Sequence, residues 1–258
     1  MTQAPTTWVL LRGLARESRH WDDFPAHLQQ HFPRSRILMP DLPGNGRRCD
    51  ERSPGTVAGM VDAYRATIGA AIAQEAQAPL GLIGLSLGGM VAAQWAVSHA
   101  DEVSAVVMIN SSARPYSRMW QRLRPNVWPW ALRLLGSTSV RAREHAALCM
   151  TSRLRRNDDA LLERWTTWAH ECPMTRVNRL RQLSAAIRFH LPPTPPAAPV
   201  LVLTSAADDM VAPACSQAIA RAWRAPIERH PAAGHDLTLD DGRWAAGRIR
   251  AWCDGAIA

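Results

Sequence analysis

One serine in this sequence has the neighbours that a nucleophile needs. Ser86 is the centre of Gly84-Leu85-Ser86-Leu87-Gly88, which follows an apolar run at 80–83 and precedes a helical pattern. A serine on a tight turn between a strand and a helix projects its hydroxyl above the sheet, and the crowded backbone there accepts only small residues two positions away. The spacing predicts a nucleophile at Ser86; the alternative is a glycine-rich strand exit with an incidental serine.

A serine hydroxyl becomes a good nucleophile only beside a base, and the base needs a carboxylate to orient it. Asp208 and Asp209 follow the apolar run 200–204, and His235 follows the run 227–230 and a glycine. Both positions come after the carboxyl ends of expected strands, where open α/β sheets build their sites. The pattern predicts a Ser-Asp-His set, with either aspartate available as the carboxylate.

The elements that must position these residues alternate along the chain. Short apolar runs separated by helical patterns are typical of parallel crossover units, so we predict a mostly parallel central sheet with helices on both faces. The expected strands are 8–11, 37–39, 80–84, 103–109, 200–204 and 227–230, and the expected helices are 21–31, 56–76, 87–99, 214–223 and 243–256.

One segment interrupts the alternation. Residues 113–190 contain helical patterns and no convincing strand, and they are followed by a connector with five prolines between 192 and 199. Such a proline-rich stretch is stiff and extended. We therefore predict a core formed by 1–112 and 191–258 and a helical cap inserted at 113–190.

Several motifs together resemble those of α/β-hydrolase-fold serine hydrolases, and among these the pimeloyl-acyl-carrier-protein methyl ester esterases. The segment 41–46 reads D-L-P-G-N-G, 84–89 reads G-L-S-L-G-G, and Arg12-Gly13 follows the first strand where the family usually has His-Gly. The resemblance implies the α/β-hydrolase fold, with the cap between the family's sixth and seventh strands. It also favours Asp208 over Asp209, because Asp208 stands two residues before Met210.

The resemblance further implies an oxyanion hole made by the backbone amides of Leu14 and Leu87. Two residues depart from the family pattern: Arg12 replaces the customary histidine, and Ser205 stands where glycine is frequent. Arg12 therefore has two interpretations, a solvent-facing side chain or a contact with an anionic substrate group.

Taken together, these features predict a serine-dependent carboxylic ester hydrolase that forms an acyl-enzyme on Ser86 and uses no cofactor and no metal. Relatives with the same motifs cleave carbon-carbon bonds, eliminate small acids or transfer acyl groups, so a C-C hydrolase or lyase and an acyltransferase remain alternatives. A binding protein with little turnover is a third. The expected substrate is a small-molecule ester, and an ester that is bound to an acyl carrier or has another anionic head group is the variant considered.

The basic residues suggest a partner. All thirty are arginine, and residues 114–188 carry fifteen of them against five acidic residues, a net charge of +10 in a chain whose total is +8. Arginine-rich composition alone is one explanation; an acidic acyl carrier protein that docks on the cap is another. The candidate contacts are Arg141, Arg143, Arg153, Arg155 and Arg156.

The remaining composition excludes other classes. No run reaches the 18 to 20 apolar residues of a membrane span, and the first residues do not resemble a signal peptide. The five cysteines are scattered without a CxxC pair, which is typical of reduced thiols, so we expect a cytoplasmic protein. His27 and His31 have a metal-like spacing but no third ligand, and no nucleic-acid motif accompanies the high isoelectric point.

Overall fold

The centre of the molecule is a parallel sheet of six strands. The computed structural model describes residues 5–74 and 79–255, and within them the strand order is β2-β1-β3-β4-β5-β6 with every neighbouring pair parallel. The strands are β1 (Thr7–Leu11), β2 (Arg36–Leu38), β3 (Leu80–Leu85), β4 (Val103–Ile109), β5 (Val200–Ser205) and β6 (Ile227–His230).

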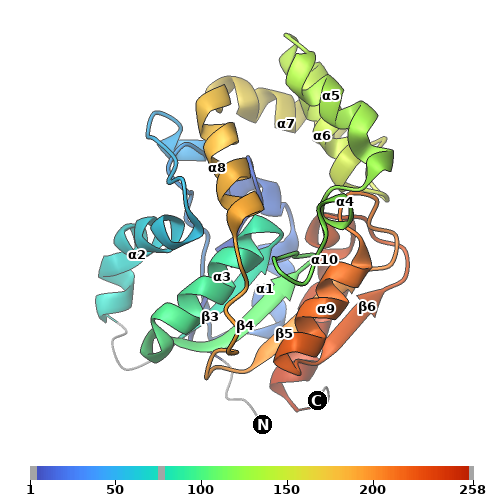
Figure 1. The fold of residues 1–258 in the computed structure, drawn as a ribbon. Helices are drawn as coiled ribbons and strands as arrows, with labels where there is room; N and C mark the ends of the chain where they lie inside the picture. Colours follow the sequence, from blue (N-terminus) through green and yellow to red (C-terminus); the bar gives the residue numbers. More distant parts are fainter. Residues whose placement is uncertain (1–4, 75–78, 256–258) are drawn as a thin grey trace.

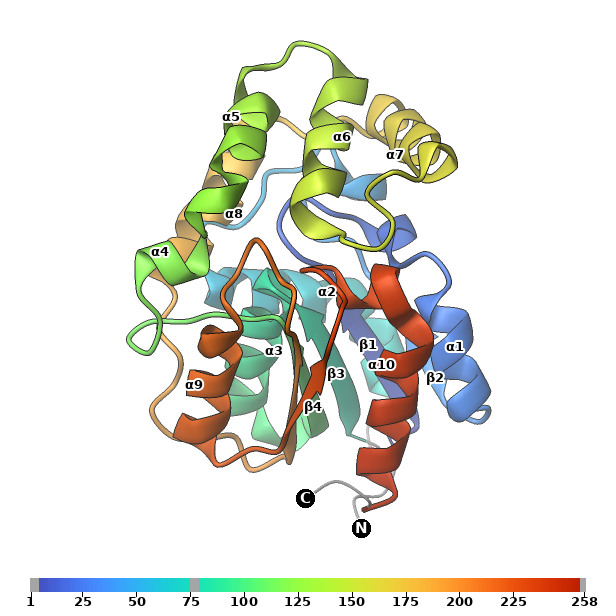
Figure 2. The same cartoon turned by 90° about the vertical axis from the view of Figure 1, so that its right-hand side faces the viewer.

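Helices cover both faces of this sheet (Figures 1 and 2). The central strands β3 and β4 are almost entirely buried, as continuous apolar runs must be when both faces are covered. One apolar core lies between the sheet and α2 (Val57–Gln74), α3 (Leu87–Ser98) and α9 (Pro213–Trp223). A second core lies between the opposite face and α1 (Phe24–His31) and α10 (Leu237–Cys253). The predicted α/β class is confirmed.

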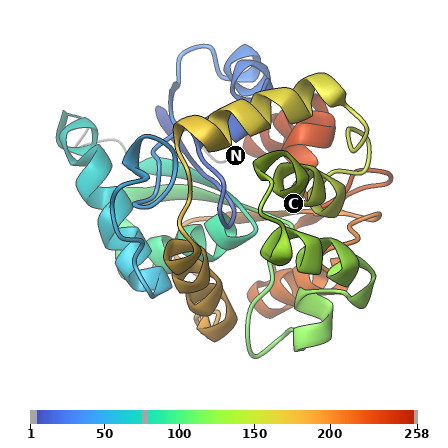
Figure 3. The same ribbon diagram turned by 90° about the horizontal axis from the view of Figure 1, so that it is seen from above.

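Five α-helices between β4 and β5 lie at the end of the sheet opposite the chain termini (Figure 1). We call them the cap helices: α4 (Met119–Arg122), α5 (Trp128–Gly136), α6 (Val140–Thr151), α7 (Asp159–Glu171) and α8 (Arg176–Arg188). Seen from above, α7 (yellow) runs across the top of the view, α8 (brown) lies below its left end, and α5 and α6 (green) lie to the right of α8 (Figure 3). The cap follows the fourth strand of this six-stranded sheet, so the strand numbers that the resemblance implied do not apply here.

Local sequence determines where the cap helices begin. The side chains of Ser139, Asp158 and Thr175 each accept a hydrogen bond from the backbone amide three residues later, which satisfies a donor that a helix start otherwise leaves free. At the base of the cap, the Leu191 amide donates to the Arg114 carbonyl at 2.7 Å. The two ends of the cap segment therefore leave the core side by side.

The boundaries of most elements lie within one to three residues of the prediction. The last helix is the exception, because α10 begins at Leu237 rather than at 243. Asp236 caps it by accepting from the Leu239 amide, and the backbone bends inside it at Asp241 (φ −151°, ψ 74°). A bent helix breaks the apolar periodicity, which explains the late predicted start. Residues 75, 76 and 256 of the predicted helices lie outside the described ranges.

Single-turn 3-10 helices join several of these elements. They are Ser18–Trp21, Gly46–Arg48, Ala100–Glu102 and Pro125–Val127. None of the helices in the described ranges combines the length and the apolar character that crossing a bilayer requires.

Two glycines let the strand, the turn and the helix around Ser86 pack closely. A Cβ atom on Gly88 would lie 1.9 Å from the Leu11 carbonyl oxygen, and one on Gly84 would lie 2.2 Å from the Gly88 carbonyl oxygen. The first strand and the start of α3 are thus in backbone contact beside the serine. This close packing is what the glycine positions in the motif predicted.

We expect Gly88→Ala to lower the free energy of unfolding by about 1–3 kcal/mol, the usual cost of overpacking a core. The matched control is Gly69→Ala in α2, where an added Cβ meets nothing within 4 Å; there alanine should raise stability by up to ~1 kcal/mol through helix propensity. Urea denaturation of both variants measures the difference. Equal stability of the two variants would contradict the close packing.

Candidate active site

The turn between β3 and α3 holds Ser86 in a strained backbone conformation. Its φ is +56° and its ψ −113°, a region that residues other than glycine rarely occupy. The Ser86 amide donates to the Ile109 carbonyl at 2.8 Å, and the Ser86 carbonyl accepts from the Gly89 amide at 3.0 Å and the Ser111 hydroxyl at 2.9 Å. These bonds from β4 and α3 maintain the strain and fix the position of the serine.

Asp208 is the aspartate that contacts His235. Its Oδ2 lies 2.8 Å from His235 Nδ1, and its Oδ1 accepts from the Met210 and Val211 amides at 2.8 Å each. Both Asp208 and His235 are buried. Asp209 is more exposed and forms an ion pair with Arg153 instead. The contact fixes one imidazole nitrogen and leaves Nε2 for the substrate side.

Asn110 holds the histidine loop against the ends of two strands. Its side-chain amide donates to the His235 carbonyl at 2.7 Å and to the Ser205 hydroxyl at 3.0 Å, and its Oδ1 accepts from the Ser205 amide at 2.9 Å. The serine that replaces the family's frequent glycine is therefore part of this network. In the sequence Asn110 is simply the residue that follows β4, and nothing in the neighbouring residues predicts that it holds the histidine loop.

Ser86 and His235 line one cavity, but within the described part of the chain no hydrogen bond joins their side chains. The Ser86 hydroxyl turns about a single torsion angle, and catalytic hydrogen bonds often shorten only when substrate is bound. The structure therefore brings Ser86 and His235, the expected nucleophile and base, to the wall of one cavity.

The two expected oxyanion amides flank this serine. A Cβ on Gly13 would lie 3.5 Å from Ser86 Cβ, so the turn that carries Leu14 passes directly beside the nucleophile. The Leu87 amide is at the first position of α3, where a helix leaves its N–H groups without intrahelical partners. The Leu87 amide and the turn that carries Leu14 thus lie beside Ser86, as the expected oxyanion hole requires.

Arg12, the departure from the family pattern, is buried and faces Asp236. Its Nη2 donates to Asp236 Oδ2 at 2.5 Å, and its guanidinium lies over the Trp21 ring at 4.6 Å from the centroid. Neither expected role is observed, because the side chain is neither solvent-facing nor free for a substrate anion. The pair instead joins the oxyanion turn to the residue that follows His235.

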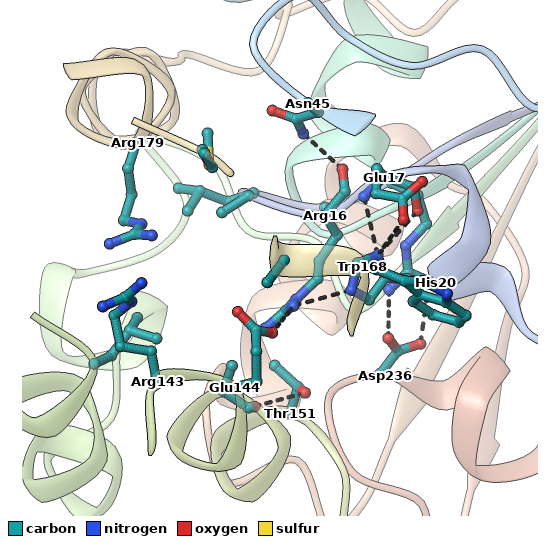
Figure 4. A pocket seen from close by; sticks show the side chains of 18 of the residues that line it. Arg16, Glu17, His20, Asn45, Arg143, Glu144, Thr151, Trp168, Arg179 and Asp236 are labelled. Carbon is teal, nitrogen blue, oxygen red and sulfur yellow. Dashed lines mark hydrogen bonds and ion pairs between the residues drawn. The ribbon is translucent and has the colours of Figure 1, made fainter. Parts of the chain in front are cut away.

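A cavity of about 380 Å³ lies between the strand ends and the cap. Its floor comes from the segments after β1, β2, β3, β5 and β6, and its roof from α5 to α8 and the segment between α7 and α8. Arg16 on the floor and Glu144 on α6 form an ion pair of 2.6 Å that joins the two sides (Figure 4). A cavity of this size admits a small molecule to Ser86.

Opposing effects determine the charge of the buried histidines. Burial alone would lower the pKa of His235, but the charge of Asp208, the hydrogen bond to it and the charge of Asp236 together raise it. For His20, also on the cavity wall, burial and the charges of Arg16 and Arg12 hold the pKa well below the usual value. His20 is therefore uncharged at neutral pH.

The raised pKa of His235 predicts the pH profile. A base accepts a proton only when it is neutral, so kcat/KM should rise with pH and reach half its maximum above 6.5, the ordinary histidine pKa. NMR titration of the imidazoles in Ser86→Ala assigns the transition, and His20 should not titrate over the same range. A half-maximum below pH 6 would contradict the effect of Asp208.

The five cap arginines proposed as partner contacts have different surroundings. Arg143 lines the cavity. The other four form ion pairs: Arg141 with Glu163, Arg153 and Arg156 with Asp209, and Arg155 with Asp22 and Asp158. Arg179, which the sequence did not single out among fifteen similar residues, also lines the cavity. Among the residues described, no cluster of three or more potential metal ligands is present.

Comparison with known proteins identifies relatives of this fold. Residues 8–247 match the protein family described as the alpha/beta hydrolase family. A solved structure of a hydrolase from Pseudomonas aeruginosa PA01 superposes with a TM-score of 0.76, at 20% identity, over 98% of this chain and 92% of that one.

Two curated proteins are similar over part of their length. Lipase LipV of Mycobacterium tuberculosis is 29% identical over 41% of this chain and 37% of its own. A pimeloyl-acyl-carrier-protein methyl ester esterase of Vibrio cholerae is 29% identical over 46% of this chain and 42% of its own. The chain thus spans about two-fifths of the length of these curated relatives.

Proposed function

Because this chain belongs to the alpha/beta hydrolase family, we propose that it is a serine-dependent carboxylic ester hydrolase with Ser86, His235 and Asp208 as its triad. The observation that carries the proposal is the 2.8 Å contact between Asp208 and His235 on the wall of a cavity that Ser86 also lines. The lipase and esterase relatives support the same reaction class.

In the proposed mechanism, the Ser86 hydroxyl attacks the ester carbonyl while His235 Nε2 accepts its proton. Asp208 holds the imidazole and stabilises its charged form. The amides of Leu14 and Leu87 bind the oxygen of the tetrahedral intermediate. His235 then protonates the departing alkoxide, and a water that it activates releases the acid from the acyl-serine.

The proposal assigns different roles to two parts of the chain. Residues 1–112 and 191–258 supply the triad and the oxyanion amides, and residues 113–190 form a cap that selects the substrate. No step requires a cofactor. The cytoplasmic location stays a prediction from the scattered cysteines.

A carrier-bound ester is the second candidate substrate. It is supported by the similarity to the Vibrio cholerae esterase and by the excess of arginine in the cap. Arg141, Arg153 and Arg156 keep at least 39% of their side-chain surface exposed despite their ion pairs. Hydrolysis of free and carrier-bound forms of one ester tests this, because a docking surface should give a salt-sensitive preference for the carrier-bound form.

A fluorophosphonate probe and a panel of esters test the proposed reaction together. Labelling at Ser86 with hydrolysis of the panel supports the esterase. Labelling without hydrolysis would favour a C-C hydrolase or lyase or an acyltransferase on the same site. Neither labelling nor turnover, with retained binding of ligands, would favour a binding protein.

A further inference from the structure

Within residues 5–74 and 79–255, two arginines on the cavity wall have no carboxylate partner. Arg143 on α6 and Arg179 on α8 reach into the cavity from different helices, and their guanidinium groups point toward one another (Figure 4). Arg143 donates only to the carbonyls of Ser137 and Thr138, at 3.2 and 3.0 Å. Within the described ranges, Arg179 has no hydrogen bond or ion pair.

The two other arginines that line the cavity each have a carboxylate partner. Arg12 pairs with Asp236 at 2.5 Å, and Arg16 pairs with Glu144 at 2.6 Å. Glu144 is adjacent to Arg143 in the sequence, but its carboxylate lies on Arg16 (Figure 4). The positive charge that remains uncompensated in the cavity is therefore concentrated on Arg143 and Arg179.

This arrangement is unfavourable without an anion. Burial lowers the pKa of Arg179, the charges of Arg143 and Arg16 lower it further, and the charge of Glu144 only partly opposes them. A guanidinium nevertheless stays charged at neutral pH. An anion placed between the two groups would replace mutual repulsion with charge-assisted hydrogen bonds, which are about twice as strong as neutral ones.

The position of the two groups indicates what kind of anion fits. Guanidinium groups present forked donors that match a carboxylate, and they share with Ser86 a cavity whose volume of about 380 Å³ suits a small molecule. One small molecule in this cavity can therefore contact both Ser86 and the two arginines. We infer that Arg143 and Arg179 form a subsite for a free carboxylate on the ester substrate, remote from the scissile bond.

The inference rests on the proposed function, and it narrows the substrate class to monoesters of dicarboxylic acids. The subsite acts on binding, because it contacts a group that takes no part in the bond cleavage. Its loss should therefore raise KM more than it lowers kcat.

A matched pair of substrates tests the inference: mono-p-nitrophenyl adipate, which carries the free carboxylate, and its methyl ester, in which that group is capped. In the wild type we expect kcat/KM to favour the anionic form at least about tenfold, the effect of one charged hydrogen bond. Arg143→Gln and Arg179→Gln should each remove most of this preference. Arg176→Gln, an exposed position on the same helix, is the control and should keep it.

The outcomes separate the subsite from the reaction. Hydrolysis of both esters with a ratio near one in every protein would overturn the subsite and leave the esterase intact. If neither ester is hydrolysed, calorimetry on Ser86→Ala decides: binding of monomethyl adipate but not of dimethyl adipate, lost in Arg179→Gln, supports the subsite, and equal binding of the two overturns it.

A competition arm distinguishes the source of the anion. Adipate and inorganic phosphate at equal concentration should compete with the anionic ester, adipate more strongly. Stronger competition by phosphate would overturn the carboxylate assignment. Thermal unfolding of each variant checks that the cap remains folded.

Discussion

Replacing Ser86 with alanine is expected to lower kcat/KM for a short-chain aryl ester by on the order of 10⁴-fold or more, because no other group can form the acyl-enzyme. The oxyanion amides and the cavity remain in the variant, so a small residual rate over water is expected. The fold should be unaffected, since serine and alanine tolerate the positive φ of this turn about equally. Initial rates with p-nitrophenyl acetate measure the loss.

A matched control uses a serine outside the site. Ser137 lies in the loop between α5 and α6, outside the residues that line the cavity, and its hydroxyl bonds to the backbone of Ser139. Ser137→Ala should therefore keep the wild-type rate. The two variants should have the same circular dichroism spectrum. If Ser86→Ala kept a turnover within tenfold of the wild type, Ser86 would not be the nucleophile and the proposed mechanism would be wrong.

The sheet and the turn that carries Ser86 were predictable because their signals are local. Continuous apolar runs such as 103–109 identify strands buried on both faces, and the observed β4 has these bounds. The glycines at 84 and 88 are required by contacts a few residues away or across one neighbouring strand. Short-range constraints of this kind leave a pattern in the sequence.

The prediction that Asp208, and not Asp209, is the carboxylate partner of His235 needed information from the family. Asp208 and Asp209 are adjacent and follow the same strand, so strand position alone does not separate them. In the structure the difference is a contact with a residue 27 positions away, because Asp208 reaches His235 while Asp209 turns to the cap arginines. The spacing of the family motif favoured Asp208; composition and periodicity did not.

The charge pairs of the cavity were not predictable from the sequence. Arg16 pairs with Glu144, 128 positions later in the sequence, and Arg12 pairs with Asp236, 224 positions later. With fifteen arginines between 114 and 188, nothing local distinguishes Arg179, which lacks a partner within the described ranges, from its paired neighbours. Only the packing of the cap over the strand ends decides which charges are neutralised.

The Arg12–Asp236 pair provides the second prediction. Both side chains are about 3% exposed. Burial alone would raise the pKa of Asp236, but the charge and hydrogen bonds of Arg12 lower it, so the carboxylate is ionised. Arg12→Met keeps most of the side-chain volume and leaves a buried charge without a partner, which should cost about 3–5 kcal/mol of unfolding free energy. Urea denaturation at pH 7 measures it.

A double-mutant cycle separates the pair from its surroundings. Asp236→Asn keeps an acceptor for the Leu239 amide at the start of α10 and removes only the charge. If the two charges stabilise each other, Arg12→Met/Asp236→Asn should be more stable than the sum of the single changes predicts, by at least about 1 kcal/mol. Additive losses would contradict the pairing.

An exposed ion pair is the control for burial. Arg141 and Glu163 lie 2.9 Å apart with more than half of each side chain exposed, so Arg141→Met should cost only about 0–1 kcal/mol. Arg12 also precedes the turn that carries Leu14, and Asp236 follows His235, so Arg12→Met should lower kcat as well. Loss of stability with an unchanged kcat would show that the pair supports the fold without positioning the oxyanion turn relative to the base.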